Sequence, residues 1–205
     1  MQARDFKNII FDLGGVIINL DEQKTIRAFA QLSSLPEDTI EKSILQFKEY
    51  HLFEKGLIPP DQFRNALRDK FQIEASDDEI DQCMNAMLLD IPVQRIKLIK
   101  SLNQQAIFLL SNTNQIHYTR FNQIFTATTG EESLNDCFKK AYYSHLVKMR
   151  KPDREIYECI LRENDLQATE TLFLDDNLTN LEGAQSIGIS TFHVKHPSQL
   201  FQLFQ

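Results

Sequence analysis

The sequence predicts an α/β fold, in which a doubly wound parallel (Rossmann-like) sheet carries an inserted bundle of α-helices. From about residue 92 onward, short apolar segments with strand character alternate with segments of helical periodicity, and a further strand lies near the N-terminus. Residues 20–90 have helical periodicity and no convincing strand. We therefore expect residues 1–19 and 91–205 to form the core domain, and residues 20–90 to form the inserted bundle.

The first predicted strand covers residues 8–11 and is followed by Asp12, Gly14 and Gly15. Its short β-branched and aromatic sequence is typical of a buried strand. A buried carboxylate costs free energy unless it is paired or bound to a metal, and two glycines let the backbone turn sharply and approach a ligand. We interpret Asp12 as a nucleophile in a phosphate- and metal-binding loop; an aspartate that only caps the loop is the alternative.

The helical bundle is predicted from four helix starts within residues 20–90. Asp21 is a candidate N-cap, and Pro36 and Pro60 suit the first turn of a helix. Ser76 begins a fourth run with the composition of a helix start. Apolar residues at helical spacing follow each start, so we expect about four amphipathic helices.

Strands and helices alternate in the second half of the chain. The strands are predicted at residues 106–110, 140–143, 171–174 and 190–194. The helices are predicted at residues 92–102, 115–125, 153–162, 178–187 and 198–204, and residues 126–136 are predicted as a loop. This order of elements is typical of a parallel sheet that is covered by helices on both faces.

The composition argues against several classes of partner. A net charge of −7 without a block of basic residues disfavours nucleic acid and anionic membranes as partners. Cys83, Cys137 and Cys159 are widely spaced and form no CxxC pair, so they indicate neither a zinc site nor a disulfide framework, and a reducing cytoplasm fits best. We expect no signal peptide, and the longest apolar stretch is too short to span a bilayer.

Polar residues follow three of the predicted strands at the edge where an open α/β sheet binds its ligands. They are Asp12, Ser111 and the pair Asp175 and Asp176, and Lys151 lies in a loop just before a helix. Taken singly, a serine or lysine at such a place is more typical of a turn or a solvated loop. Their occurrence together at one edge predicts a functional site.

These residue types suit the transfer of a phosphoryl group. A carboxylate such as Asp12 can attack phosphorus and form an aspartyl-phosphate. Hard oxygen ligands, here Asp12, Asp176 and a backbone carbonyl, suit Mg²⁺. Ser111 and the Asn112 amide can donate hydrogen bonds to phosphate oxygens, and Lys151 supplies a fixed positive charge.

The motifs resemble those of the haloacid dehalogenase-like hydrolase superfamily. Four segments carry the resemblance in type and order: residues 10–16, 110–114, 148–153 and 172–177. They span essentially the whole chain, and residues 20–90 resemble the helical cap that is inserted after the first motif. Within the superfamily, the chain looks closest to the branch that holds bacterial α-glucose-1-phosphate phosphatase and the N-terminal phosphatase domain of soluble epoxide hydrolase.

The resemblance implies a role for each matching residue. Asp12 would be the nucleophile and a magnesium ligand, and Gly14 would give the metal its backbone carbonyl. Leu13 and Gly14 of the same loop would bind the phosphoryl group together with Ser111 and Asn112.

The resemblance also implies the remaining charged residues and the cofactor, Mg²⁺. Lys151 would pair with the phosphoryl group and with Asp12. Asp176 would be the direct metal ligand, with Asp175 beside it or in the shell behind it.

One position departs from the pattern of the superfamily's phosphatases. These enzymes usually carry a second aspartate two residues after the nucleophile, as general acid and base, and Gly14 stands there in this chain. A positioned acid contributes roughly 10²- to 10⁴-fold in rate. The glucose-1-phosphate phosphatase-like branch also has glycine at this place, and His51, Glu54 and His117 are candidates for a substitute.

Three functions compete. We expect a magnesium-dependent phosphatase that acts on a small phosphorylated metabolite, such as a sugar phosphate, through an aspartyl-phosphate. A metal-independent dehalogenase is a second reading, which the Asp175–Asp176 pair disfavours. A non-enzymatic phosphate-binding or regulatory protein is the third, because the second aspartate is missing.

Overall fold

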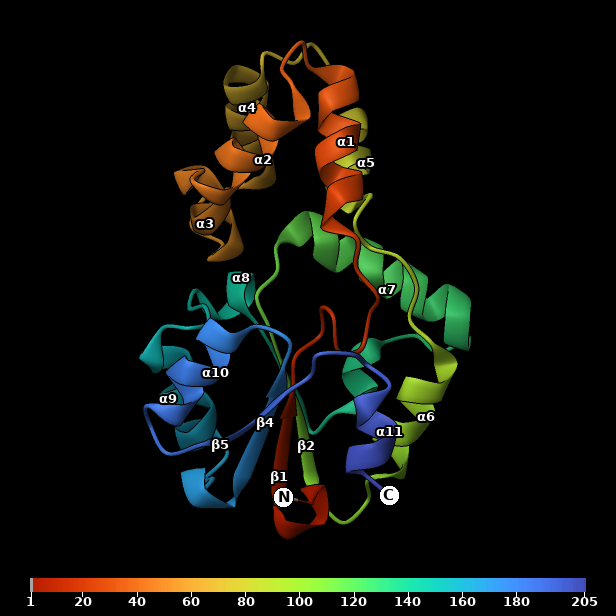
Figure 1. Ribbon diagram of the computed structural model, residues 1–205, viewed down its shortest axis with the longest axis vertical. Coiled ribbons are helices and arrows are strands. Elements are labelled where there is room, and N and C mark those ends of the chain that lie inside the picture. The colour runs from red at the N-terminus through yellow and green to blue at the C-terminus, as the bar shows by residue number, and fades with distance from the viewer. Residues whose placement is uncertain (1) are drawn as a thin grey trace.

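The computed structural model describes residues 2–205, apart from the side chain of Leu45, and forms a five-stranded parallel sheet (Figure 1). The strands lie in the order β3-β2-β1-β4-β5. Their bounds are Asn8–Phe11 for β1, Ala106–Ser111 for β2, Lys140–Tyr143 for β3, Thr171–Asp175 for β4 and Ser190–His193 for β5. The predicted α/β fold with a doubly wound parallel sheet is confirmed.

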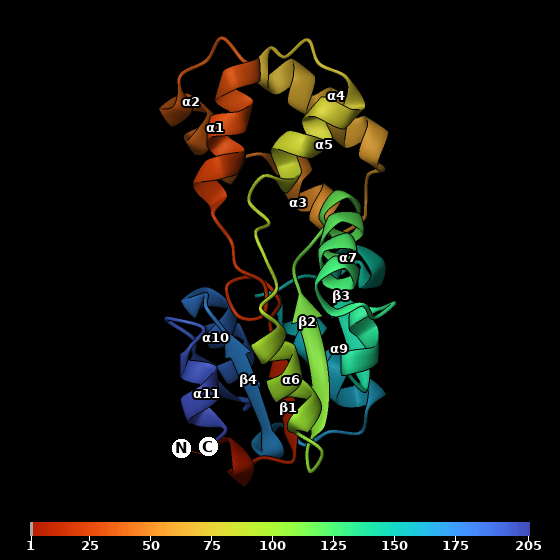
Figure 2. The ribbon, with the colours of Figure 1, turned by 90° about the vertical axis from the view of Figure 1, so that its right-hand side faces the viewer.

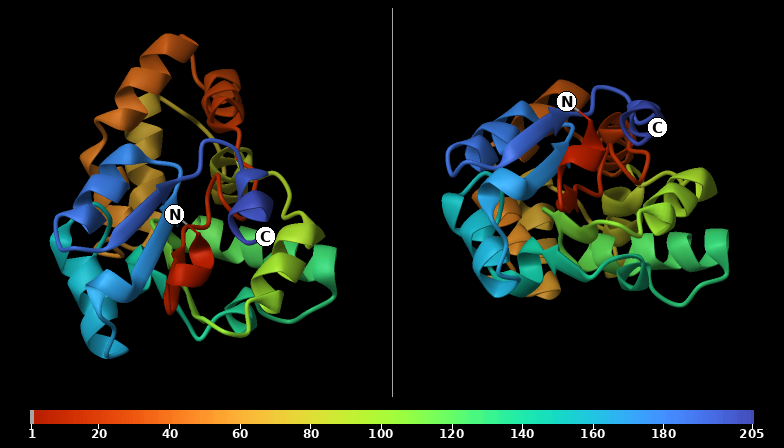
Figure 3. Two further views of the ribbon diagram at one scale, coloured as in Figure 1. Left: turned by 60° about the horizontal axis from the view of Figure 1, so that its bottom comes forward. Right: turned by 90° about the horizontal axis from the view of Figure 1, so that it is seen from below.

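Helices cover both faces of this sheet. Successive side chains of β1 point to opposite faces, as the pleat of a strand requires. Ile9 and Phe11 pack against the layer formed by α6, α7 and α11, whereas Ile10 packs against α9 and α10. Figure 3 shows the two helix layers on either side of the sheet. The helix bounds are Val93–Ser101 for α6, Gln115–Thr129 for α7, Arg154–Glu163 for α9, Leu178–Gln185 for α10 and Gln199–Leu203 for α11.

Strand β1 lies where the chain changes the side on which it adds strands. β2 and β3 follow on one side of β1, and β4 and β5 lie on the other. At such a switch point the connecting loops diverge and open a crevice at the carboxyl ends of the two central strands. The backbone N–H of Asp12 donates to the carbonyl of Leu174 at 2.8 Å, which carries the β1–β4 pairing up to this crevice.

Helices α1 to α5, here called the helical segment, lie beyond the carboxyl ends of the strands (Figures 1 and 2). They have a hydrophobic core of their own, in which Phe29, Phe63 and Phe71 are fully buried. Both chain ends lie at the opposite end of the molecule. Among residues 2–205, none of the helices combines the length and apolar character of a membrane span. The bounds are Glu22–Leu32 for α1, Glu37–Leu45 for α2, Lys48–Glu54 for α3, Pro60–Phe71 for α4 and Asp77–Asn85 for α5.

The helical segment contains five helices, and the expectation of four was wrong. The chain breaks after α2, and Phe47 has extended backbone just before α3. The Phe47 ring nevertheless lies 6.2 Å from that of Phe63. The apolar spacing therefore continues across the break, and the sequence pattern gives no sign that the helix ends there.

Helix α7 ends at Thr129, four residues past the expected end at 125, and is followed by Gly130 with φ of 74°. Four short helices were not expected: η1 Ala3–Asp5, η2 Leu134–Cys137, α8 Ser144–Val147 and η3 Ala168–Glu170.

The strands β1 to β5 and the helices α6 to α11 are here called the sheet domain. The end of α3 contacts its loops. Lys55 Nζ lies 2.7 Å from Asp153 Oδ2, which joins the helical segment to the loop before α9. Gly56 has φ of 61°, and a Cβ there would lie only 2.1 Å from the carbonyl oxygen of His145. Because only glycine fits this close approach, the helical segment can lie directly against α8.

Candidate active site

A cavity of about 530 Å³ lies between the carboxyl ends of the strands and the helical segment. We call it the site cavity. It is lined by the predicted residues Asp12, Leu13, Gly14, Ser111, Asn112, Lys151 and Asp176. The structure therefore brings together residues from four separate parts of the chain, as expected for loops that leave the same edge of a parallel sheet.

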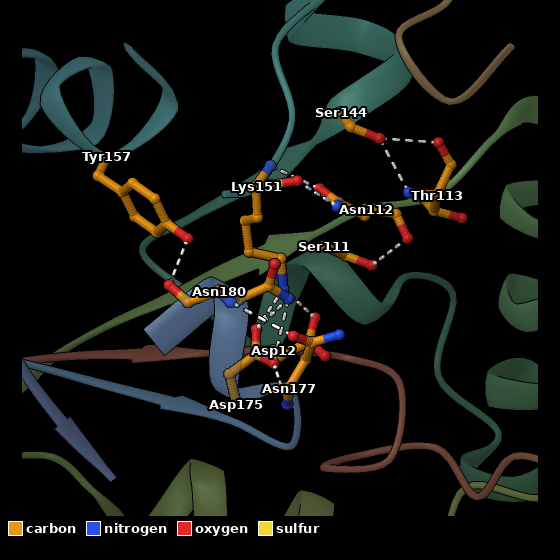
Figure 4. A network of polar contacts seen from close by, with 10 residues as sticks. All are labelled: Asp12, Ser111, Asn112, Thr113, Ser144, Lys151, Tyr157, Asp175, Asn177 and Asn180. Carbon is orange, nitrogen blue, oxygen red and sulfur yellow. Dashed lines mark hydrogen bonds and ion pairs between the residues drawn. The ribbon is translucent and has the colours of Figure 1, made fainter. Parts of the chain in front are cut away.

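Lys151 joins two of the carboxylates at the bottom of this cavity (Figure 4). Its Nζ donates to Asp12 Oδ1 at 2.7 Å and to Asp175 Oδ2 at 2.6 Å. The lysine side chain is 1% exposed, so the ammonium is shielded from solvent. Burial opposes its charge, but Asp12 and Asp175 together raise the pKa of Lys151 above its ordinary value, which keeps it protonated.

Asp175 is held from several sides. Its Oδ1 accepts a hydrogen bond from the backbone N–H of Asn177 at 2.7 Å. The side-chain amide of Asn180 lies 3.2 and 3.1 Å from its two oxygens, and Lys151 completes the set. The sequence predicted Asp175 beside or behind a direct metal ligand. Its occupied oxygens suit a group that positions Lys151 and the β4 loop.

Asp176 differs from its neighbour because its side chain is exposed at the rim of the cavity. The chain of the first loop passes very close to it. A Cβ on Gly15 would lie 2.1 Å from Asp176 Oδ2, and Gly15 has φ of 64°. A glycine is therefore required at this position for both backbone conformation and space.

The three carboxylates Asp12, Asp175 and Asp176 present ligand atoms within 4.8 Å of one another, and we call them the acidic cluster. Desolvation is the largest cause that raises the pKa of Asp12, and with its acidic neighbours it brings that pKa to about 7. Partial desolvation and the charge of Asp175 raise the pKa of Asp176 to about 6. One ammonium does not balance three carboxylates, and hard oxygen donors of this kind fit Mg²⁺.

Ser111 and Asn112 follow β2 at the same edge. The Asn112 side chain accepts from the backbone N–H of Lys151 and donates to the Lys151 carbonyl, both at 2.9 Å. The predicted phosphate-binding residue Asn112 therefore uses its side chain to hold the Lys151 loop (Figure 4). Ser111 is buried at the cavity wall, and within residues 2–205 its hydroxyl makes one long hydrogen bond, to the Asn112 carbonyl at 3.5 Å.

The three candidates for a substitute acid lie in different environments. His117 lines the cavity, but its ring nitrogens contact the Met84 carbonyl at 3.0 Å and the Asn114 side chain at 3.3 Å. Burial lowers the pKa of His117 to about 4, so it is neutral and structural. His51 does not line the site cavity. Glu54 lines it, and its buried carboxylate lies 3.0 Å from Arg150.

Three contributors to the site were not predicted from the sequence: Asn177, Asn180 and Arg150. Asn177 and Asn180 are one helical turn apart at the start of α10, so both reach back toward the end of β4. That spacing after the paired acids was a usable signal. Arg150 had no such signal, because its partner Glu54 is 96 residues away in the chain.

The sequence of the chain is similar to those of known hydrolases. A family model for haloacid dehalogenase-like hydrolases matches residues 6–188. D-ribitol-5-phosphate phosphatase of Bacteroides thetaiotaomicron is 30% identical over 91% of this chain and 90% of its own length. The sesquiterpene phosphatase AstK of Aspergillus oryzae is 26% identical over 92% of this chain and 90% of its own length.

Solved structures show the same similarity. A HAD family enzyme of Bacteroides thetaiotaomicron, in complex with magnesium and inorganic phosphate, superimposes with a TM-score of 0.82 and 35% identity. The match covers 92% of this chain and 93% of that one. The sequence and fold are thus similar along nearly the full length of both chains.

Proposed function

The chain belongs to the haloacid dehalogenase-like hydrolase family, and we propose that it is a magnesium-dependent phosphatase for small phosphorylated metabolites. The observation that carries the proposal is the buried Lys151, whose ammonium joins Asp12 to Asp175 beside the exposed Asp176. A reactive carboxylate, a fixed cation and hard oxygen ligands are the groups that phosphoryl transfer requires. Relatives named as phosphatases support this assignment.

Asp12, Asp176 and the Gly14 carbonyl are the groups that would hold Mg²⁺, with Asp175 behind them. When bound, the metal would neutralise the acidic cluster and the phosphate oxygens, so that one anion can approach another. The excess of carboxylates over ammonium groups supports this assignment, as does the magnesium in the similar solved structure.

In the proposed reaction, an oxygen of the Asp12 carboxylate attacks phosphorus, and the bond from phosphorus to the leaving oxygen breaks. The product is an aspartyl-phosphate on Asp12, which water then hydrolyses to phosphate and the free carboxylate. Lys151 orients Asp12 through its bond to Oδ1 and supplies positive charge to the transferred group. Ser111 and the backbone of Asn112 would donate to the phosphate oxygens.

The helical segment, as the cap of the core formed by residues 1–19 and 91–205, would select the leaving group. A second cavity of about 440 Å³, here called the helical cavity, lies among its helices. Its lining includes the apolar rings of Phe29 and Phe47 and the carboxylates of Glu22, Glu41 and Glu54. The carboxylates would repel a second phosphate, so we infer a neutral alcohol as leaving group.

Two classes of neutral alcohol suit these walls. A polyol or sugar matches the carboxylates, and the named activity of the ribitol-5-phosphate phosphatase supports it. A more apolar alcohol matches the phenylalanines, and the sesquiterpene phosphatase supports that class. We favour the sugar or polyol phosphate, since the relative with this activity is the more similar in sequence.

The three free cysteines fit a cytoplasmic, reducing compartment.

The test is a screen of the purified chain against p-nitrophenyl phosphate and a panel of sugar, polyol and prenyl monophosphates. We expect hydrolysis that requires Mg²⁺ and is abolished by EDTA. Asp12→Asn should reduce kcat by at least about 10³-fold, because it removes the nucleophile. Asp38→Asn, an exposed acid of α2 that lines neither cavity, is the matched control and should keep full activity.

Three results would contradict the proposal. Halide release from haloacids without magnesium would identify a dehalogenase instead. Tight binding of vanadate or beryllium trifluoride with no turnover of any phosphate would identify a phosphate-binding protein. Equal rates for wild type and Asp12→Asn would exclude Asp12 as the nucleophile.

A further inference from the structure

The site cavity and the helical cavity share part of their walls. Glu54, Tyr50, Glu22 and Arg150 are among the residues that line both. If the phosphoryl group lies at the acidic cluster and the alcohol lies among the helices, the bond that breaks lies near this shared wall. A residue there is therefore placed to act on the oxygen that leaves phosphorus.

That oxygen needs a proton when the leaving group is an ordinary alcohol, because an alkoxide is a strong base. Few groups on the shared wall can supply one. Glu22 is exposed to solvent. Burial and the nearby Glu54 and Glu22 raise the pKa of Tyr50 well above its ordinary value, which makes it a poor proton donor. The guanidinium of Arg150 does not release its proton.

We propose that Glu54 is the general acid and base of this site, an inference that rests on the proposed phosphatase function. In the first step, Asp12 bonds to phosphorus, the electron pair of the breaking bond goes to the leaving oxygen, and the Glu54 carboxyl gives that oxygen its proton. In the second step, the Glu54 carboxylate takes a proton from the attacking water. The electron pair of the phosphorus–Asp12 bond returns to Asp12, and Glu54 is again protonated.

The local contacts of Glu54 suit this role. Its Oε2 accepts a hydrogen bond from Nε of Arg150 at 3.1 Å. The Nη2 of Arg150 and the Nδ1 of His51 lie 3.0 and 3.8 Å from the same oxygen. Within residues 2–205, Oε1 takes part in none of the hydrogen bonds. One oxygen is thus held by charged neighbours, and the other stays available to a ligand.

The charges around Glu54 agree with a carboxyl that alternates between its two forms. Burial raises the pKa of Glu54, whereas Arg150 and then His51 lower it, and the net direction is upward. Tyr50 and Glu22 are further titratable groups on the shared wall, and Glu41 and His51 line the helical cavity beside it. A raised pKa makes a carboxyl a better proton donor near neutral pH, and an adjacent guanidinium still stabilises the carboxylate that forms.

A purely structural role for the Glu54–Arg150 pair is the competing explanation, because the pair also joins the helical segment to the sheet domain. The chain offers a matched control. Lys55 follows Glu54 directly and pairs with Asp153 in the same loop region, but lines neither cavity. Lys55→Gln breaks a neighbouring connection between the same two parts without touching the site.

The experiment measures kcat/KM for two substrates, because this ratio reports the steps up to release of the alcohol. For a sugar or polyol phosphate, Glu54→Gln should reduce kcat/KM by about 10²- to 10⁴-fold. For p-nitrophenyl phosphate the loss should be below about 10-fold, because nitrophenolate is a weak base that leaves without a proton. Lys55→Gln should change both values equally and by less than about 3-fold, as expected for a partly exposed ion pair outside the site.

A rapid-mixing experiment tests the second step. With p-nitrophenyl phosphate, Glu54→Gln should release one equivalent of nitrophenol in a burst and then turn over slowly, because the aspartyl-phosphate lacks its general base. Wild-type kcat/KM for the alcohol phosphate should fall at high pH as Glu54 loses its proton, and this limb should be absent in Glu54→Gln. A structural ion pair would produce neither result.

Equal losses of kcat/KM with both substrates, or a Lys55→Gln variant as impaired as Glu54→Gln, would overturn the proposed role of Glu54 but not the phosphatase function. Absence of phosphatase activity in the wild type would overturn the proposed function and this inference together. If Glu54→Gln does not fold, Glu54→Asp gives the same comparison, because it withdraws the carboxyl by one methylene group while keeping its charge.

Discussion

The ammonium of Lys151 lies between two buried carboxylates, and its position depends on a few short contacts. Asp175 receives the Asn177 N–H and the Asn180 amide, so it is fixed before any ligand binds. Asp12 accepts a hydrogen bond from Lys151 with one oxygen and belongs to the acidic cluster. Preorganised charges of this kind stabilise developing charge without reorganising at the moment of reaction. At the scale of single residues, the site is therefore rigid on the Asp175 side and open on the Asp176 side.

Gly15 provides a prediction at this scale. In Gly15→Ala, the new Cβ would overlap Asp176 Oδ2 and displace that carboxylate. We expect the affinity for Mg²⁺ to fall by about 10-fold or more, as for other changes that misplace a metal ligand. The measurement is the rise in Tm at a series of magnesium concentrations c, because the stabilisation follows RT ln(1 + c/Kd) and a weaker site needs proportionally more magnesium for the same rise.

The matched control for this prediction is Gly130→Ala. Gly130 also has a positive φ, of 74°, but a Cβ there would meet no atom of the described residues within 4 Å. Both variants share the backbone strain, and only Gly15→Ala adds the contact with Asp176. An unchanged magnesium titration in Gly15→Ala would show that Asp176 does not hold the metal.

Helices α5 and α7 are joined by a buried histidine. His117 near the start of α7 contacts the Met84 carbonyl of α5, and its own backbone N–H donates to the Asn114 side chain at 3.0 Å. Since α7 belongs to the sheet domain and α5 to the helical segment, this neutral ring fixes one side of the boundary between them. At the scale of elements, the site cavity has its shape because such contacts hold the helices above the strands.

The pH dependence of stability tests this contact. Burial lowers the pKa of His117 from 6.5 to about 4, so the unfolded chain binds a proton in this range and the folded chain does not. The stabilisation is present above pH 6.5 and is lost as the pH falls toward 4. Because of His117, we expect the free energy of unfolding to fall by about 2 kcal/mol between pH 7 and pH 5, as measured by urea denaturation.

In His117→Gln, the loss of unfolding free energy between pH 7 and pH 5 should be smaller by about the same amount, since glutamine does not titrate in this pH range. His145 remains in the variant, and burial lowers its pKa to about 4 as well, so part of the slope should persist. If the two proteins lose stability in parallel between pH 7 and pH 5, His117 is not buried as a neutral ring.

The helical segment and the sheet domain each have their own hydrophobic core, and they enclose the site cavity between them. The acidic cluster lies on the sheet domain alone. The shared wall combines Glu22, Tyr50 and Glu54 of the helical segment with Arg150 of the sheet domain. At the scale of the whole molecule, the proposed function places metal binding on the sheet domain and makes alcohol recognition depend on the contact between the two parts. A change in their contact should alter the second without the first.

Gly56 tests this division. In Gly56→Ala, the Cβ would overlap the carbonyl of His145 and push α3 away from α8. We expect kcat/KM to fall by about 10²-fold, which is the effect of misplacing reacting groups by roughly 1 Å. The magnesium-dependent rise in Tm should stay at the wild-type value. Loss of magnesium binding in this variant would contradict the separation of the two roles.

The sequence alone determined the fold class and the edge at which the site lies. Both follow from local information, because the alternation of strands and helices is read within short windows, and residues that end parallel strands meet at one edge. Asp12, Ser111, Lys151 and Asp176 were placed together for this reason. The tertiary structure decided the rest: the fifth helix, the two asparagines on Asp175, and the pairing of Arg150 with Glu54. Those features depend on the distances between elements far apart in the chain, and neither periodicity nor motif spacing contains that information.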